Sequence, residues 1–339
     1  MINPKSQISE VLSAGTQHTP RETTEASTDL SKNPKSIAIL GAGAWGMALA
    51  NLAAANGHRV RVWSRQGSQT LEAVLQNAQI VLSAISMKGV SDVSSQVQSF
   101  PVSPETIFVT ATKGLDPESR CTPSQIWQTA FPDHGVVVLS GPNLSKEIEL
   151  GLPAATVVAS NVPTAAQVVQ LAFSSNLLRV YTNPDPLGVE LGGTLKNVIA
   201  IASGVCDGLQ LGTNAKAALV TRGLTEMVRI GNLWGANTET FYGLSGLGDL
   251  LATCNSPLSR NYQVGYQLAG GQTLTEILAN LQGTAEGVNT CRVLVQIAQQ
   301  QNIAMPITEQ VYRLLQNEVS PRQALDELML RNIKPEYNY

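Results

Sequence analysis

Short runs of consecutive apolar residues, rich in β-branched side chains, recur along the first half of the chain. The first run is Ser36–Leu40. Further runs, with room for a helix between them, lie at residues 60–63, 80–84, 106–110, 136–139 and 156–159. Strands that are apolar throughout are typical of sheets covered on both faces. Because the strands alternate with helical segments, we expect a parallel, doubly wound α/β sheet.

The pattern changes after the turn-forming stretch Asn183-Pro184-Asp185-Pro186. Beyond it the apolar residues recur with the period of a helix, and no convincing strand is found. Ser320-Pro321 has the form of a helix N-cap followed by proline, and Gly270-Gly271 that of a helix stop. We therefore predict an α/β domain over residues 36–185 and an all-α domain over residues 186–330. Its helices are expected at residues 189–205, 215–232, 258–268, 273–281, 288–301, 307–316 and 321–328.

Composition narrows the class of protein. The chain has 339 residues, 43% of them hydrophobic, and a formal net charge of −3. It is long and apolar enough to bury a core, and its slightly negative charge argues against binding to nucleic acid. Its four widely spaced cysteines favour reduced thiols, and no apolar run is long enough to span a membrane. We expect a cytoplasmic protein without membrane insertion.

The first 35 residues differ from the rest of the chain. They are rich in Ser, Thr, Gln and Glu, with little apolar periodicity. Such a composition predicts a disordered tail, and it lacks the apolar segment of a signal peptide.

The motif Gly41-Ala42-Gly43-Ala44-Trp45-Gly46 directly follows the first predicted strand and opens a predicted helix over residues 47–56. Glycines at this spacing let the backbone turn tightly and approach a pyrophosphate held at the helix N-terminus. A glycine-rich turn without a ligand would have the same composition. The strand before it, the helix after it and the second strand at Val60 favour a dinucleotide-binding site.

The end of the second strand bears on the choice of cofactor. It reads Trp63-Ser64-Arg65, where an NAD-binding domain usually carries an acid for the ribose 2′-hydroxyl. An arginine there suits the 2′-phosphate of NADP(H). Use of both NADP(H) and NAD(H), or an ordinary surface arginine, are the alternatives.

Two loops follow predicted strands at the edge of the sheet where α/β folds bind ligands. Thr112-Lys113-Gly114 follows the fourth strand, and Ser140-Gly141-Pro142-Asn143-Leu144-Ser145 follows the fifth. Lys113 is therefore either an anion-binding group over the cofactor crevice or a solvated loop lysine.

Lys196 lies in Gly192–Gly204, a segment of small and apolar residues with helical periodicity. Small residues allow tight packing, and removal from water lowers the pKa of a lysine toward the range of a general acid or base. A structural ion pair with a carboxylate, or extension of the side chain to water, are the alternatives.

A last cluster begins at Gly246-Leu247-Gly248-Asp249, where Asp249 fits the role of a helix N-cap. Ser259-Arg260-Asn261 opens the next predicted helix, where free N–H groups, a hydroxyl, an amide and a guanidinium can converge on a phosphate. Arg260 could instead form a surface ion pair. The combination favours a phosphorylated small molecule as ligand.

Together these motifs, in this order and at these spacings, resemble the bacterial-type NAD(P)-dependent glycerol-3-phosphate dehydrogenases. The resemblance extends over nearly all of residues 36–330. It implies a Rossmann-type domain followed by an all-helical domain similar to that of 6-phosphogluconate dehydrogenase. It also implies reversible reduction of dihydroxyacetone phosphate to sn-glycerol 3-phosphate for glycerophospholipid synthesis, with NADP(H) and also NAD(H) as cofactors, by a homodimer. No cluster of His, Cys and carboxylates suggests a metal site.

By the same resemblance, Lys196 is the catalytic proton donor and acceptor, with Asp249 beside it in the substrate site. The implied substrate-binding residues are Lys113, Gly141, Asn143, Lys196, Asp249, Ser259, Arg260 and Asn261. The implied cofactor-binding residues are Gly41, Gly43, Trp45, Gly46, Arg65, Lys113, Ser145, Arg260 and Glu286.

The chain departs from the family pattern in two places. The connection from Arg65 to the third strand, Gln66–Gln79, is shorter than is usual in the family. Much of it is a predicted helix over residues 70–76. The third strand continues as Ile85-Ser86-Met87-Lys88, where the family more often has a proline.

Two other functions compete with this interpretation: a dehydrogenase acting on another small acid or acyl thioester, and a nucleotide sensor without turnover. The predicted phosphate site argues against the first, and Lys196 with Asp249 against the second.

Overall fold

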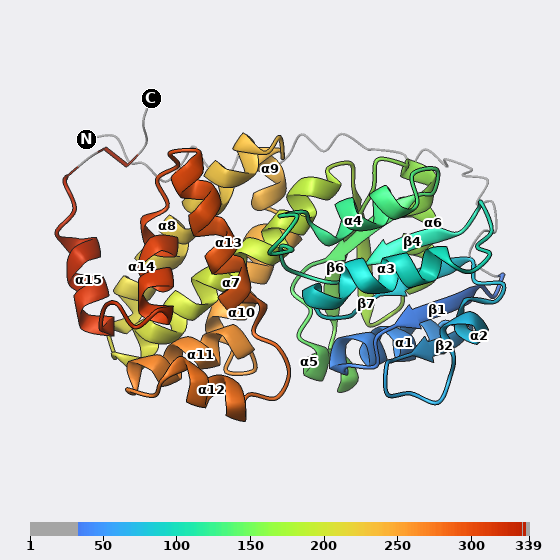
Figure 1. Ribbon diagram of the computed structural model, residues 1–339, viewed down its shortest axis with the longest axis horizontal. Coiled ribbons are helices and arrows are strands. Elements are labelled where there is room, and N and C mark those ends of the chain that lie inside the picture. The colour runs from blue at the N-terminus through green and yellow to red at the C-terminus, as the bar shows by residue number, and fades with distance from the viewer. Residues whose placement is uncertain (1–32, 334, 337–339) are drawn as a thin grey trace, which may run out of the picture. The chain divides into compact units, whose positions relative to one another are not determined.

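The structure, a computed structural model, describes residues 33–333, 335 and 336. Of the predicted tail, residues 1–32 lie outside the described residues. Seven strands form one sheet in the order β2-β1-β3-β4-β5-β6-β7 (Figure 1). The strands are β1 (Ser36–Leu40), β2 (Arg59–Trp63), β3 (Ile80–Ser83), β4 (Ile107–Thr110), β5 (Val136–Ser140), β6 (Ala154–Ala159) and β7 (Leu178–Asn183).

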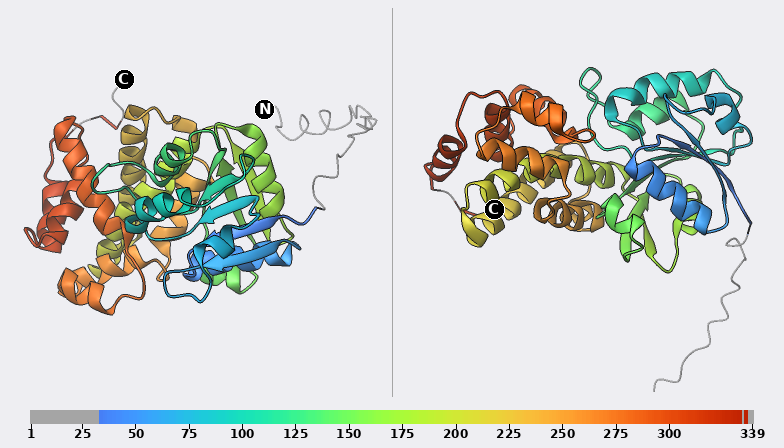
Figure 2. Two further views of the ribbon diagram at one scale, coloured as in Figure 1. Left: turned by 45° about the vertical axis from the view of Figure 1, so that its right-hand side comes forward. Right: turned by 90° about the horizontal axis from the view of Figure 1, so that it is seen from below.

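Helices cover both faces of the sheet (Figure 2), which explains why its strands are apolar throughout. Successive side chains of a strand point to opposite faces, so Ile37 and Ile39 pack in one core cluster and Ala38 and Leu40 in another. The first cluster includes α1 (Ala44–Ala55) and α6 (Pro163–Phe173). The second includes α2 (Leu71–Leu75), α3 (Val90–Gln98) and α4 (Pro123–Ala130).

The sheet is not parallel throughout, so this part of the prediction is wrong. β6 runs antiparallel to β5, with Ser140 opposite Val157. The connection between them, which contains the short helix α5 (Ser145–Glu149), returns the chain to the sheet at the edge it has just left. The loop that carries Gly141 and Asn143 therefore stays at the carboxyl edge of the parallel strands.

β7 is missing from the predicted elements. Its Leu178 and Val180 are buried, but Arg179 and Tyr181, which alternate with them, are exposed. It pairs only with β6 and lies at the edge of the sheet, where one polar face is common. A search for fully apolar runs does not find such a strand.

Every element from α7 onward in the described chain is a helix, and the prediction of a Rossmann-type sheet followed by an all-α part is confirmed. Ser320 caps its helix with Gln323 in a capping box, and Gly270 ends α11, as predicted. A π-helical turn, Leu244–Gly248, precedes α10. The helices are α7 (Pro186–Gly208), α8 (Gly212–Leu233), α9 (Thr238–Phe241), α10 (Asp249–Asn255), α11 (Arg260–Ala269), α12 (Leu274–Asn280), α13 (Glu286–Gln300), α14 (Pro306–Leu315) and α15 (Pro321–Met329).

α7 is the helix on which the helical half is built. It contacts α8, α10, α11, α13 and α14, and it also reaches β5 and β6 of the sheet. By length and composition alone it could cross a membrane, but 89% of its apolar window is buried inside the protein. Its composition is therefore that of a core helix.

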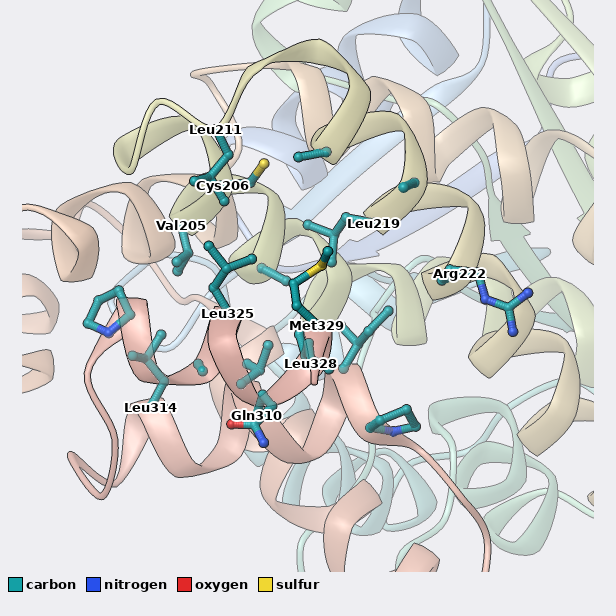
Figure 3. A pocket seen from close by; sticks show the side chains of 18 of the residues that line it. Val205, Cys206, Leu211, Leu219, Arg222, Gln310, Leu314, Leu325, Leu328 and Met329 are labelled. Carbon is teal, nitrogen blue, oxygen red and sulfur yellow. The ribbon is translucent and has the colours of Figure 1, made fainter. Parts of the chain in front are cut away.

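The two halves of α7 have different surroundings. Its C-terminal half helps to line an apolar cavity of about 400 Å³ between α7, α8, α14 and α15 (Figure 3). Val205, Leu219, Leu325 and Met329 are in the wall of this cavity, and none of the predicted site residues is. The N-terminal half carries Lys196 and faces the sheet.

Candidate active site

The space beyond the carboxyl ends of β1 and β3, where Gly41 lies against Ala84, is the candidate dinucleotide crevice. The chain runs outward from β1 to β2 and then crosses back to β3, so this is the point where the strand order reverses and where such sheets bind ligands. Gly41 leaves β1 with φ +121°, and a Cβ on it would lie 2.5 Å from the carbonyl oxygen of Ala84 after β3. The turn can pass this close to β3 only because position 41 is glycine.

The N-terminus of α1 is free to bind an anion. Gly43, at the N-cap, has no side chain to accept from the first N–H groups of α1, and the first turn of α1 holds no acidic residue. A Cβ on Gly43 would meet no atom of the described residues within 4 Å. Open space, unpaired N–H groups and the helix dipole together fit the pyrophosphate of a dinucleotide. Trp45 packs against the sheet core, and Ser145 begins α5, which contacts α1.

Arg65 extends from the end of β2 toward the same crevice. Its side chain is exposed, and a Cβ on Gly89, just before α3, would lie 2.6 Å from its Nη2 atom. The connection from Gln66 to Thr70 carries no acidic residue. No carboxylate in that connection therefore competes with a phosphate for the Arg65 guanidinium.

Glu286 reaches the crevice from the other side. It is the first residue of α13, and its Oε1 accepts a hydrogen bond of 3.4 Å from the backbone N–H of Met87, after β3. Burial raises the pKa of this carboxyl, while Arg260 and Lys88 act in the opposite direction. The helical half thus places a carboxylate against the residues that follow β3.

Lys113, Lys196 and Asp249 come from three distant segments and meet at one carboxylate. Asp249 accepts a hydrogen bond of 2.6 Å from the Nζ of each lysine, one on each oxygen. The side chains of Lys196 and Asp249 are only 7% and 3% exposed. Thr253, one turn after Asp249, also accepts from Lys196. An ammonium group has three N–H donors, so one remains for a ligand.

The charges of this cluster are strongly coupled. Burial lowers the pKa of Lys196 to about 8, with Asp249 opposing the shift and Lys113 adding to it. Burial by itself would raise the pKa of Asp249, but Lys113 and Lys196 hold it below its ordinary value. Two cations and one anion leave a net positive charge when all three are ionised, which favours an anionic ligand.

Asp249 is not a helix N-cap, so that interpretation is wrong. It is the first residue of α10, and Gly248 occupies the capping position. A carboxylate that accepts from two ammonium groups gains stronger hydrogen bonds than a backbone N–H would offer, which explains the difference.

Polar atoms without partners lie beside this cluster. Because Gly193 has no side chain, α7 can lie close to the end of β5. A Cβ at this position would lie 2.3 Å from Ser140 Oγ and 3.4 Å from Lys113 Cε. Ser140 Oγ and Asn143 Oδ1 are buried and make no hydrogen bond within the described structure. Since an unpaired buried polar atom costs about 1–3 kcal/mol, these oxygens are suited to a ligand hydroxyl.

The start of α11 lies along the same side of α7. Ser259 caps this helix, its Oγ accepting from the N–H of Tyr262 at 3.2 Å, as the prediction of a helix opening there requires. Asn261 donates to Asn197 on α7 at 2.9 Å and accepts from the N–H of Gly287 on α13 at 3.0 Å. A Cβ on Gly283, before α13, would lie 2.4 Å from Arg260 Nη1. Arg260 is exposed, and its charge acts on the Glu286 carboxyl.

The predicted site residues therefore come from separate segments into two adjoining groups, one at the dinucleotide crevice and one around Asp249. Sequence reasoning missed Ser140, Thr194 and Thr253 as members of this site. Hydroxyl residues are common and leave little signal, although Thr253 follows Asp249 by one helical turn. Among the described residues, no group of three or more His, Cys, Asp or Glu could hold a metal ion.

A dinucleotide crevice on a doubly wound sheet, joined by a helical half that presents a buried lysine with lowered pKa, defines a two-domain nicotinamide-dependent dehydrogenase. Comparison with known proteins gives the family. Residues 36–73 and 66–166 match the model of the NAD-dependent glycerol-3-phosphate dehydrogenase N-terminus, and residues 185–326 match that of its C-terminus. The chain belongs to the NAD-dependent glycerol-3-phosphate dehydrogenase family, and the resemblance noted above is confirmed.

Individual relatives agree with this assignment. The chain is 82% identical over 302 residues to a glycerol-3-phosphate dehydrogenase [NAD(P)+] of Nostoc sp., covering 89% of this chain and 98% of the relative. The corresponding protein of Trichormus variabilis is 81% identical over the same shares of the two chains. Among solved structures, a glycerol-3-phosphate dehydrogenase of Coxiella burnetii superposes with a TM-score of 0.84 at 35% identity, covering 88% of this chain and 99% of that one.

The match to the N-terminal model is made in two overlapping pieces, which meet after Arg65. This is the place where the chain has the shortened connection between β2 and β3. In the structure that connection contains little more than the five-residue helix α2, capped by Thr70.

The crevice can be tested with Gly41→Ala. We expect the dissociation constant for NADPH, measured by fluorescence titration, to rise by at least about tenfold, because the added Cβ would collide with the Ala84 carbonyl and strain the turn. Gly57→Ala is the matched control, since Gly57 also has a positive φ, of +84°, but open space around its Cβ position. Equal affinities for Gly41→Ala and the wild type would place the dinucleotide elsewhere.

Proposed function

We propose that this chain catalyses the reversible reduction of dihydroxyacetone phosphate to sn-glycerol 3-phosphate with NADPH or NADH. Its membership of the NAD-dependent glycerol-3-phosphate dehydrogenase family and the names of its close relatives support this reaction. The observation that carries it is the pair of lysines on Asp249, beside a crevice suited to a dinucleotide. A nucleotide sensor would not need a buried lysine whose pKa is lowered to about 8.

Binding of the substrate phosphate is proposed at the start of α11. Arg260 offers a guanidinium there, and the first turn of the helix offers N–H groups and a favourable dipole. Ser259 and Asn261 hold this turn in place through bonds within the protein. A phosphate bound at the start of α11, away from the reacting carbonyl, would supply binding energy that fixes the orientation of the substrate.

Lys196 is the proposed proton donor and acceptor. The nicotinamide cofactor, when bound, would supply a hydride to the carbonyl carbon, which leaves the carbonyl oxygen as an alkoxide. The free N–H of Lys196 would bond to that oxygen, stabilise its negative charge and then transfer the proton. In the direction of oxidation, the neutral amine would take the proton from the substrate hydroxyl. Asp249 keeps Lys196 oriented through its hydrogen bond, while burial lowers the pKa of Lys196 to about 8 against the opposing effect of Asp249.

Arg65 supports a preference for NADPH over NADH. A guanidinium at the end of β2 can pair with a 2′-phosphate, and the following connection offers no acid for a 2′-hydroxyl. The relatives are named NAD(P)+-dependent, which is compatible with use of both cofactors.

The reaction is tested by following the absorbance of NADPH, and in parallel NADH, with dihydroxyacetone phosphate as acceptor. We expect rapid oxidation that requires the phosphate, so that unphosphorylated dihydroxyacetone reacts far more slowly. A higher kcat/KM with NADPH than with NADH would support the role of Arg65. Tight binding of NADPH without oxidation would contradict the proposed activity and favour a sensor.

Replacement of the proposed proton donor tests its role. Lys196→Ala should lower kcat by at least about a hundredfold, the usual contribution of a general acid, while NADPH still binds. Lys216→Ala is the control, because Lys216 forms a comparable 2.6 Å ion pair with Asp207 away from the cluster. If turnover of Lys196→Ala stays near that of the wild type, another group supplies the proton.

The lowered pKa of Lys196 predicts how the rate varies with pH. Reduction needs the ammonium form, so its kcat should be constant at low pH and fall as the pH rises through about 8. Oxidation needs the amine, so its kcat should rise through the same range. Steady-state rates from pH 6 to 10 in both directions give the measurement. Two profiles that move in the same direction would contradict the assignment.

The remaining proposals concern organisation. We propose a division into domains at residues 36–185 and 186–330, supported by the end of β7 at Asn183 and the start of α7 at Pro186. A homodimer is supported by the family resemblance alone. The lack of membrane insertion is supported by the burial of α7, and a cytoplasmic location by the free thiols of all four cysteines.

A further inference from the structure

Glu190 is a buried carboxylate that the proposed mechanism does not use. It lies on α7, and only 2% of its surface is exposed. Its Oε1 accepts a hydrogen bond of 2.8 Å from the backbone N–H of Ser124, and its other oxygen accepts from the Ser124 hydroxyl. Ser124 is the second residue of α4, so a side chain of the helical half binds the N-terminus of a helix on the sheet.

This contact completes the hydrogen bonding at the start of α4. The first N–H groups of a helix have no partner within it. Pro123 has no N–H, and Thr122 and Gln125 satisfy each other through a capping box. The capping box leaves the N–H of Ser124 without a partner, and Glu190 accepts its hydrogen bond.

A second contact of the same kind lies one turn further along α7. Thr194 and Glu190 are four residues apart and share a face of the helix. Thr194 Oγ1 accepts a hydrogen bond of 3.1 Å from the N–H of Gly114. Since Gly114 and Ser124 lie near the two ends of the connection from β4 to α4, α7 holds that connection at both ends. Leu115 within it is 1% exposed and packs in the core of the helical half.

The connection held in this way carries Lys113, and the helix that holds it carries Lys196. Lys196 lies about 9 Å along the axis from Glu190, at 1.5 Å of rise for each residue. Both lysines donate to Asp249 at 2.6 Å. The distance between the two ammonium groups therefore depends on how α7 is seated against residues 111–124.

We propose that Glu190 is a positioning residue, whose contact with the start of α4 sets the placement of Lys113 relative to Lys196 and so the geometry of the reacting centre. This inference deepens the proposed function and rests on it. Glu190 itself touches neither of the lysines in the hydrogen bonds of the structure, and it acts through α7 and the connection that follows β4.

Stability alone is a poor reason for a carboxylate at this position. Burial raises the pKa of Glu190 to about 7, and the hydrogen bonds from Ser124 and Thr122 reverse only part of that shift. A charge removed from water is unfavourable unless its hydrogen bonds repay it, and an apolar residue of similar size is often as stabilising. A directional contact, in contrast, specifies one seating of α7 on the connection.

Glu226 offers a matched control. It is also buried, on α8, and accepts from the N–H groups of Ile307 and Thr308 and from the Thr308 hydroxyl at the start of α14. The chemistry is the same, a carboxylate at a helix N-terminus, but it lies within the helical half, in the wall of the cavity in Figure 3. Glu226→Gln should lower the thermal midpoint without changing kcat of the folded enzyme.

The test compares Glu190→Ala, Glu190→Gln and Glu226→Gln. For Glu190→Ala we expect kcat to fall roughly a hundredfold, as for a displacement of about 1 Å at a reacting centre, with little change in the dissociation constant for NADPH. The deuterium isotope effect measured with 4-deuterated NADPH should rise, because the chemical step becomes slower. Glu190→Gln keeps an oxygen for the Ser124 N–H and should recover most of the rate.

Three outcomes would overturn the proposal: a folded Glu190→Ala variant with the wild-type kcat and isotope effect, losses of activity in all variants that simply follow the thermal midpoint, or a Glu190→Gln variant no better than Glu190→Ala. If Glu190→Ala does not fold, Ser124→Ala, which removes only the hydroxyl, replaces it and should give a smaller loss of the same kind.

Failure of the proposed function is separately visible, because the wild type itself would then not oxidise NADPH with dihydroxyacetone phosphate. In that case the rate at which a trace amount of acetic anhydride acetylates Lys196 with release of acetate, measured by mass spectrometry, still reports the placement of Lys196. The proposal expects this rate to rise in Glu190→Ala and not in Glu226→Gln. Equal rates in all three proteins would overturn it.

Discussion

The sharing of the Asp249 carboxylate by two lysines is the interaction on which the site depends. Two ammonium groups this close would repel each other and lose protons if the carboxylate were absent. With Asp249 between them, Lys113 and Lys196 bond at 2.6 Å, and the pKa of Lys196 is lowered only to about 8. A buried lysine balanced in this way can hold a proton near neutral pH and can also release it.

The fold brings the three side chains together from parts of the chain that are far apart in sequence. Lys113 follows β4 at the carboxyl edge of the sheet, Lys196 lies on the core helix α7, and Asp249 begins α10 after a π-helical turn. α7 is the common element, because it contacts the sheet, α10 and α11. Its small residues, such as Gly193 against Ser140, allow the helix to approach the end of β5. The lysine cluster around Asp249 and the proposed phosphate site at the start of α11 therefore adjoin one helix.

Much of this arrangement could be predicted from the sequence, because its causes are local. Strand β1 is an apolar run that ends at a glycine motif, and the small, apolar surroundings of Lys196 indicated its burial. Pairings between distant segments leave no local pattern. The antiparallel direction of β6, the half-polar strand β7 and the bond from Lys113 to Asp249 belong to this class, whereas the family resemblance placed Asp249 beside Lys196. Glu190, whose partner Ser124 is 66 residues away, is another example.

The most direct measurement is the pH dependence of kcat for reduction of dihydroxyacetone phosphate by the Asp249→Asn variant. An amide cannot oppose the effects of burial and of Lys113 on Lys196, so the pKa of Lys196 should fall further below its ordinary value. We predict a lower kcat at every pH and a loss of activity that begins well below pH 8. A kcat and a pH profile equal to those of the wild type would contradict the central role of the shared carboxylate.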